Sequence, residues 1–163
     1  MTDPILEEPL STWTEPVLPE WIDYNGHLSE PYYVLVLGHA TDDLMDTVGL
    51  GPDYREATGA SLFTVEAHVR YLDQVGPGEQ LEARSWAIGS TSKLLWIWHE
   101  LWAAGTLRAT EEILGVHVGS DAAGGSAALP FPDAVRERIE AALVPPGPDA
   151  SRAIRLRTRS TGP

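Results

Sequence analysis

The segment Asp23-Tyr24-Asn25-Gly26-His27 places a carboxylate, an amide and an imidazole close together in the chain. A carboxylate can position water as a general base, or it can attack a carbonyl carbon itself. Hydrolysis of a thioester also needs donors for the oxyanion, and a helix that begins just after the segment offers free backbone N–H groups around residues 28–33. The segment therefore predicts acyl hydrolysis, with Asp23 as nucleophile or general base.

The same segment also has a purely structural interpretation. An Asp-x-Asn-Gly sequence is a common turn, in which the side chains cap their own backbone. Both interpretations stay open at the level of these five residues.

A second carboxylate comes from residues 61–72, which alternate in polarity as a half-buried strand does. The alternation puts Glu66 and His68 on a polar face together with Thr64 and Arg70. If that face meets a cleft at a subunit interface, Glu66 is an alternative base and His68 a substrate contact. A solvated face with Glu66 beside Arg70 explains the pattern equally well. The opposite face is expected to carry Phe63, Val65, Ala67, Val69 and Tyr71.

Aromatic residues suggest a substrate with a cationic group. Trp98 and Trp102 share one face of a predicted strand with Glu100 between them, and Tyr24 adjoins Asp23. Aromatic rings beside a carboxylate suit a quaternary ammonium group, which is attracted to the ring faces. Packing in the core or at a dimer interface is the alternative.

The sequence lacks the residues that several other kinds of catalytic site require. The chain has no cysteine, which excludes thiolate nucleophiles and thiolate metal sites. His68, His99 and His117 could bind a metal only if the sheet brought them together, and no helical metal motif supports this, so we expect no metal. The Gly-x-Ser-x-Gly sequence of serine hydrolases and a phosphate-binding loop are also absent.

The charge distribution makes nucleic acids and membranes improbable partners. The first 150 residues carry seven basic and 24 acidic side chains, so they repel phosphates and anionic lipids. No stretch of apolar residues is long enough to span a bilayer, and the amino terminus does not resemble a secretion signal. We expect a cytoplasmic protein. Four arginines near the carboxyl end could contact an anion or simply be solvated.

The elements that position these residues predict an α+β fold. A helix from about residue 30 to Val48 shows apolar side chains at spacings of three and four, and Ser29 is a plausible N-cap. Hairpin-connected strands follow, so this helix should pack on an antiparallel sheet of five or six strands. The predicted strands cover residues 14–18, 61–72, 79–88, 93–102 and 106–118, and a short helix covers residues 130–143. The predicted organisation is an irregular segment 1–12, one domain 13–144 and a Pro/Arg-containing tail 145–163.

Residues 21–33, which read WIDYNGHLSEPYY, resemble the motif that opens the central helix of hot-dog-fold acyl-CoA thioesterases of the hydroxybenzoyl-CoA thioesterase type. Ser29 stands where that family commonly has asparagine. The resemblance continues through residues 71–81 and 90–99 to the Leu129-Pro130-Phe131-Pro132 sequence. It implies a hot-dog fold with a long central helix wrapped by the sheet. It also implies that Asn25 and His27 orient the substrate, its carbonyl or the carboxylate, and that Tyr33 is a further substrate contact.

Within that family, residues 21–33, 54–59, 61–68 and 70–72 look like the branch that hydrolyses betainyl-CoA to glycine betaine and coenzyme A. Such domains occur alone or fused to carnitine dehydrogenase, so the resemblance implies a possible association with that enzyme. It implies no metal or organic cofactor, coenzyme A being part of the substrate. An exposed sheet face also predicts a homodimer or homotetramer. Another short or aromatic acyl-CoA as substrate, or non-hydrolytic acyl-CoA binding or dehydration, remain the alternatives.

Overall fold

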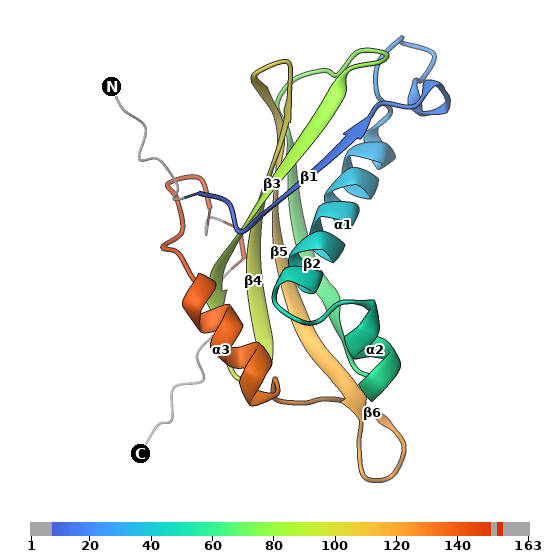
Figure 1. Cartoon of the computed structure of the whole chain (residues 1–163). Helices are drawn as coiled ribbons and strands as arrows, with labels where there is room; N and C mark the ends of the chain where they lie inside the picture. Colours follow the sequence, from blue (N-terminus) through green and yellow to red (C-terminus); the bar gives the residue numbers. More distant parts are fainter. Residues whose placement is uncertain (1–7, 151–152, 155–163) are drawn as a thin grey trace.

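A computed structural model describes residues 8–150 and 153–154 and shows one antiparallel sheet with a long helix against one face (Figure 1). The spatial order of the strands is β1-β3-β4-β5-β2, and β6 pairs with β5. The α+β prediction is confirmed. The strands are β1 (Ser11–Pro16), β2 (Ser61–Tyr71), β3 (Gln80–Ser90), β4 (Leu94–Ala103), β5 (Thr106–Ser120) and β6 (Ser126–Ala128).

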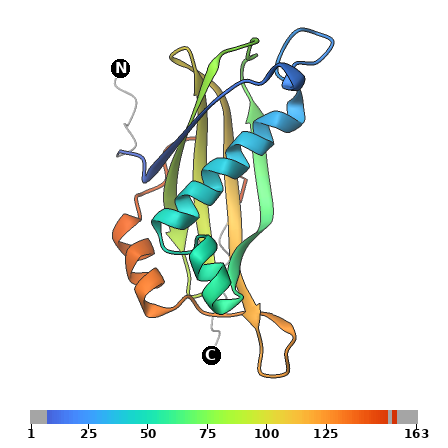
Figure 2. The ribbon, with the colours of Figure 1, turned by 45° about the vertical axis from the view of Figure 1, so that its right-hand side comes forward.

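The long helix α1 (Glu30–Thr47) lies diagonally across the sheet (Figure 2). Pro31 falls in its first turn, where a missing N–H costs nothing, and Ser29 occupies the N-cap position without a side-chain hydrogen bond. Gly49 follows with a φ of 85°, a conformation that glycine adopts readily and that ends the helix. The predicted helix is confirmed. Its buried side chains are Tyr33, Val36, Leu37, Ala40, Thr41 and Leu44.

The short elements were less predictable. Strand β1 begins at Ser11 and ends at Pro16, a shift of about three residues from the predicted 14–18, although its edge position is as expected. Helix α2 (Pro52–Thr58) and the 3-10 turn Pro19–Trp21 were missed. Both are too short to show a periodic pattern. Helix α3 (Asp133–Ala142) is shorter than the predicted 130–143 but buries Val135 and Ile139 as expected.

The apolar face predicted for β2 is correct for its residues after Glu66 but wrong for Phe63 and Val65. Val65 is the extra residue of a β-bulge between Thr64 and Glu66. Because a bulge adds one residue to one strand, the alternation of side chains reverses beyond it. Thr64 before the bulge and Ala67 after it therefore both face α1, whereas Phe63 and Val65 are 49% and 58% exposed.

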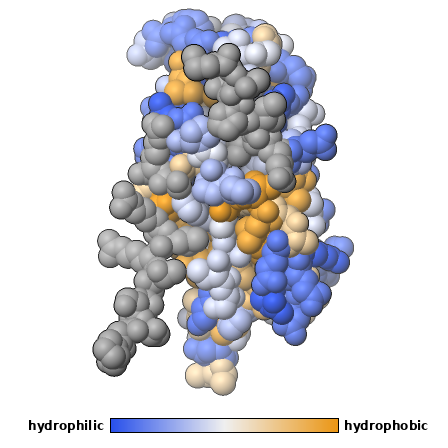
Figure 3. Space-filling model, turned by 90° about the vertical axis from the view of Figure 1, so that its left-hand side faces the viewer, coloured by the Kyte–Doolittle hydropathy of each residue, from blue (hydrophilic) through white to orange (hydrophobic). Residues whose placement is uncertain are grey.

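The face of the sheet away from α1, here called the outer face, is partly covered by the chain after α3. Val144 donates its N–H to the carbonyl of Ala87 at the edge of β3, and the chain then crosses onto the outer face. Ala150 and Ile154 are buried there against Trp98 and its neighbours. Ala150 and Ile154 of the predicted tail thus pack on the sheet, while most of its other described residues are exposed and its four arginines lie outside the described residues. On this side of the molecule the apolar surface forms patches among hydrophilic residues (Figure 3).

None of the described helices combines the length and apolarity needed to cross a bilayer. The two edge strands of the sheet are β1 and β2, and β2 is largely exposed. Its end lies near the start of α1, just after the predicted catalytic residues Asp23, Asn25 and His27.

Candidate active site

A pocket of about 840 Å³ opens where α1 begins and β2 ends. It brings together four of the sequence-predicted site residues, Asp23, Asn25, His27 and Tyr33. Its other lining residues come from the start of α1 and from the segment after β2. These are Leu28, Glu30, Tyr71, Leu72, Asp73 and Gln74.

The Asp23–His27 segment is a tight turn. The Asp23 N–H donates to the His27 carbonyl at 2.9 Å, and Gly26 has a φ of 81° that most other residues would adopt only with strain. Asp23 Oδ1 accepts the Asn25 N–H at 2.8 Å. The turn interpretation is therefore correct for Oδ1 of Asp23. The turn uses only this carboxylate oxygen, because Oδ2 has no hydrogen-bond partner among the described residues. The turn leaves Asp23 lining the pocket.

Most of the backbone N–H groups predicted to stabilise an oxyanion are already engaged. Leu28 donates to the Val75 carbonyl at 2.8 Å, and Ser29 donates to the Trp21 carbonyl at 2.9 Å. Tyr32 donates to the Ser29 carbonyl, and position 31 is proline. The prediction is therefore wrong for these residues. Among the described residues at the helix start, the Glu30 N–H is the group left at the positive end of the helix dipole.

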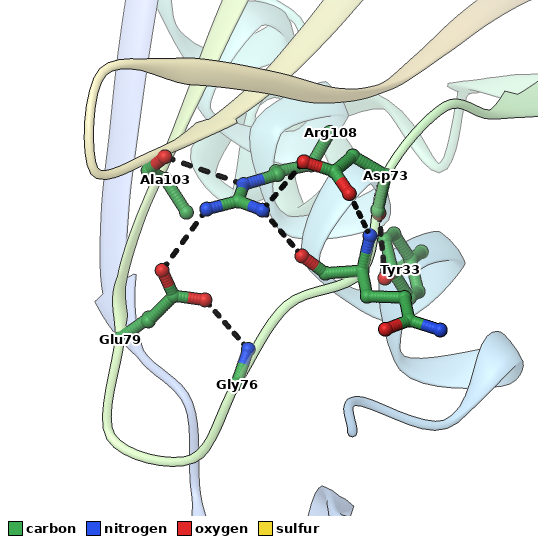
Figure 4. Close-up of polar contacts among 7 residues, drawn as sticks. Tyr33, Asp73, Gly76, Glu79, Ala103 and Arg108 are labelled. Atoms are coloured by element: carbon green, nitrogen blue, oxygen red, sulfur yellow. Dashed lines mark hydrogen bonds and ion pairs between the residues drawn. The ribbon is translucent and has the colours of Figure 1, made fainter.

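Arg108 of β5 fixes the segment after β2 that forms one wall of the pocket. Figure 4 shows its guanidinium between Asp73 and Glu79, at 2.9 Å and 3.1 Å, and close to the Ala103 carbonyl. It also donates to the Gln74 carbonyl. Only 13% of the Arg108 side chain is exposed, so these charge-assisted bonds lie in a partly desolvated setting. Arg108 thereby positions the wall without lining the pocket.

Replacing Arg108 with alanine should lower stability and activity together. We expect a loss of about 1–3 kcal/mol in the free energy of unfolding, because the wall loses its buried donors. Misplacement of the wall should lower kcat/KM by about 10–100-fold. Urea denaturation and steady-state kinetics measure the two effects.

Arg136→Ala is the matched control. Arg136 also pairs with two carboxylates, Asp133 and Glu140, but on the exposed surface of α3. Such pairs contribute little, so both quantities should stay near their wild-type values. Wild-type kinetics in Arg108→Ala would show that this arginine does not position the pocket.

The pocket is acidic and aromatic. Asp23, Glu30 and Asp73 line it, and none of the described lining residues is a lysine or arginine. The Tyr33 and Tyr71 rings meet edge to face, with centroids 5.3 Å apart. Burial raises the pKa of both phenols, and the negative charges of Glu30 and Glu111 raise the pKa of Tyr71 further, so both are neutral donors at physiological pH. Such a lining favours a cation.

The remaining predicted site residues do not line this pocket. Glu66 and His68 pair with Leu114 and Glu112 and belong to the outer face. Tyr24 is 98% exposed at the tip of the turn.

The two tryptophans also lie on the outer face, and each is engaged there. Trp98 is buried in the cluster that includes Ile154. Trp102 has the Arg84 guanidinium over its ring at 4.8 Å, so one face of that ring already holds a cation. Both indoles donate to Glu100, as their spacing suggested. Within one chain, the aromatic cluster and the Asp23 pocket are on opposite sides of the sheet.

The three strand histidines have separate environments. His99 is buried between Thr41 and Ser85, and His117 contacts Tyr54 and the Leu129 carbonyl. His68 is on the outer face. Across the described residues, no three histidine, aspartate or glutamate side chains are grouped as metal ligands.

Sequence reasoning missed Glu30, Tyr71 and Asp73 as pocket residues, and Arg108 as their support. The resemblance of residues 71–81 to a family hairpin was the available signal for Tyr71 and Asp73. Arg108 carried no signal, because its role depends on the pairing of β5 with the end of β2.

The fold and the pocket define a hot-dog thioester hydrolase, with a carboxylate-bearing turn at the start of the central helix. Residues 17–139 match the thioesterase-like superfamily, and the chain belongs to that family. The hot-dog prediction is confirmed.

Three similar proteins support this assignment. The chain is 42% identical to a betainyl-CoA thioesterase of Pseudomonas aeruginosa, over 83% of this chain and 85% of that protein. It is 37% identical to an L-carnitine dehydrogenase/betainyl-CoA thioesterase of Agrobacterium fabrum, over 86% of this chain but 30% of the fused protein. A solved Staphylococcus aureus protein in complex with CoA is 21% identical and has the same fold, with a TM-score of 0.78 over 96% of this chain and 99% of that chain. The chain is an acyl-CoA thioesterase.

Proposed function

We propose that the enzyme hydrolyses betainyl-CoA to glycine betaine and coenzyme A. The observation that carries the proposal is the lining of the Asp23 pocket, which has three carboxylates, two tyrosines and, among its described residues, no lysine or arginine. A trimethylammonium acyl group is a permanent cation and is attracted to carboxylates and to aromatic faces. The names of the two relatives, at 42% and 37% identity, support the same acyl group.

In the proposed reaction Asp23 acts on the thioester carbonyl. As a general base it takes a proton from water, whose oxygen bonds to the carbonyl carbon while the thiolate of coenzyme A leaves. As a nucleophile its carboxylate oxygen bonds to the carbonyl carbon and expels the thiolate of coenzyme A, and water then hydrolyses the resulting acyl-enzyme anhydride. In both routes the Glu30 N–H, with Asn25 or His27, donates to the oxyanion.

A homodimer or homotetramer is part of this proposal. Strand β2 is an unpaired edge of the sheet, and Phe63 and Val65 on it are exposed together with Val34 and Leu35 of α1. Unpaired edges with apolar side chains favour association. A second subunit could also supply cations for the coenzyme A phosphates. Association with carnitine dehydrogenase and a cytoplasmic location stay predictions.

The proposal is tested by thiol release from matched acyl-CoA substrates. Betainyl-CoA and tert-butylacetyl-CoA have the same shape and differ in one charge, so their kcat/KM ratio measures recognition of the cation. We expect the ratio to favour betainyl-CoA by about 10–100-fold. Acetyl-CoA and an aromatic acyl-CoA complete the set. Preference for tert-butylacetyl-CoA or for the aromatic substrate would contradict the proposed acyl group and leave thioester hydrolysis intact.

A further inference from the structure

A second hollow, here called the α1–β2 cleft, lies between α1 and the exposed edge of the sheet, with a volume of about 780 Å³. Its lining from α1 includes Val34, Leu35 and Met45, and its lining from the sheet includes Leu62 and Ile113. This largely apolar cleft also contains one deeply buried acid, Glu111 of β5.

Glu111 is in an unfavourable setting for a carboxylate. Its exposed fraction is 2%, and its Oε2 atom has no hydrogen-bond partner in the described part of the chain. Burial raises its pKa to about 7, because water no longer stabilises the charge. An unpaired buried acid destabilises a fold, so its presence calls for a functional explanation.

The sheet register places Glu111 beside the Asp23 pocket. Glu111 pairs with Val69 of β2, and Ala109 pairs with Tyr71, so Glu111 and Tyr71 are diagonal neighbours on the face toward α1. Burial and the charge of Glu30 raise the pKa of Tyr71, and the charge of Glu111 raises it further. Tyr71 lines the Asp23 pocket and meets Tyr33 edge to face. Tyr71, which lines the Asp23 pocket, is thus a sheet neighbour of Glu111, which lines the α1–β2 cleft.

We propose that Glu111, together with Tyr33 and Tyr71, binds the quaternary ammonium of the acyl group and so determines substrate specificity. The inference rests on the proposed function and assigns its specificity to particular residues. A quaternary ammonium has no N–H to donate, so it forms no directional hydrogen bonds. It is attracted instead to the charge of a carboxylate and to the faces of two aromatic rings. In betainyl-CoA one methylene separates the nitrogen from the carbonyl. The cation must therefore bind next to the carbonyl carbon on which Asp23 acts. Tyr71 lines the same pocket as Asp23.

Glu111→Gln keeps the shape of the side chain and removes its charge. We expect kcat/KM for betainyl-CoA to fall about 10–100-fold and kcat/KM for tert-butylacetyl-CoA to change by less than about threefold. Glu112→Gln is the matched control, since Glu112 is the adjacent buried acid but belongs to the outer face, where it accepts the Ile154 N–H. In Glu112→Gln the ratio of the two kcat/KM values should equal that of the wild type. Circular dichroism and sedimentation should confirm the fold and assembly of both variants.

The ratio of kcat/KM for betainyl-CoA to kcat/KM for tert-butylacetyl-CoA should also depend on pH. Because the Glu111 carboxyl has a pKa of about 7, it is charged above that pH, and the preference for betainyl-CoA should rise between pH 6 and pH 8. The other titratable groups facing it are His39 and Asp42 from α1, Tyr71 from β2 and the buried, neutral His99 from β4. Glu111→Gln should remove the pH dependence of the ratio, which separates Glu111 from these groups.

Two results would overturn the inference. Equal losses for both substrates in Glu111→Gln would mean a structural role. An altered sedimentation coefficient with an unchanged ratio would mean that Glu111 faces a second copy of the chain. Failure of the proposed function looks different, because the wild-type enzyme would then show no preference for betainyl-CoA at any pH.

Discussion

Asp23→Asn should lower kcat for thioester hydrolysis by about 10²–10⁴-fold and leave the fold and oligomer intact. The amide retains an oxygen in the position of Oδ1, so the bond from the Asn25 N–H survives. What is lost is the charge that activates water or attacks the carbonyl. Thiol release measures kcat, and sedimentation with thermal unfolding measures integrity.

Asp121→Asn is the matched control for this variant. Asp121 also accepts backbone N–H groups of its own turn, from Ala123 and Gly125, but in the hairpin between β5 and β6. It should retain full activity. If Asp23→Asn hydrolyses acyl-CoA at the wild-type rate, Asp23 is only a turn residue, and the catalytic carboxylate must be sought elsewhere, with Glu66 as the sequence-based alternative.

Local patterns were sufficient to predict the framework of the fold. Helix α1 was predictable because its buried side chains recur with the helical period, and strands β3 to β5 because short turns of small or polar residues separate them. The turn at Asp23 was predictable because Gly26 permits its positive φ. These features depend on residues close together in the sequence.

Features that depend on pairing between distant segments were not predictable. The bulge at Val65 moves Phe63 to the other face, and no property of β2 alone reveals it, because the bulge is defined against β5. Glu111 reads as one of two adjacent acids in β5, and only the register shows that it faces α1 while Glu112 faces away. The covering of Trp98 by Ile154 likewise joins segments far apart in the chain.

His99 is a second buried ionisable group whose pKa is strongly shifted. It is fully buried, and Thr41 fixes its protonation: the Thr41 hydroxyl donates to the Leu37 carbonyl, so its oxygen accepts from His99 Nε2 at 3.0 Å. Ser85 then donates to Nδ1 at 2.8 Å. The ring is therefore neutral with its proton on Nε2, and burial lowers its pKa from 6.5 to about 3.

This pKa makes the folded state sensitive to acid. Below pH 6.5 the unfolded chain binds a proton at His99 and the folded chain does not, down to pH about 3. The stability due to neutral His99 is thus complete above pH 6.5 and is lost as the pH falls, at roughly 1.4 kcal/mol per pH unit. Glu111 acts oppositely. Its folded pKa of about 7 lies above the usual value of 4.5 for a glutamate, so acidification between these values favours the folded state. The two titrations partly cancel in the wild-type enzyme.

The variant His99→Asn should therefore expose the opposing titrations. At pH 7.5 it should be less stable than the wild type by about 1–3 kcal/mol, because a packed, hydrogen-bonded ring is lost. At pH 4.5 that deficit should shrink by roughly 2–3 kcal/mol, because the wild type alone then bears the cost of keeping an imidazole unprotonated. Urea denaturation of both proteins at the two pH values measures the change. Glu111→Gln is the internal control with the opposite sign. Its stability relative to the wild type should be greater at pH 7.5 than at pH 4.5. An equal deficit for His99→Asn at pH 7.5 and pH 4.5 would show that the buried ring does not control the response to acid.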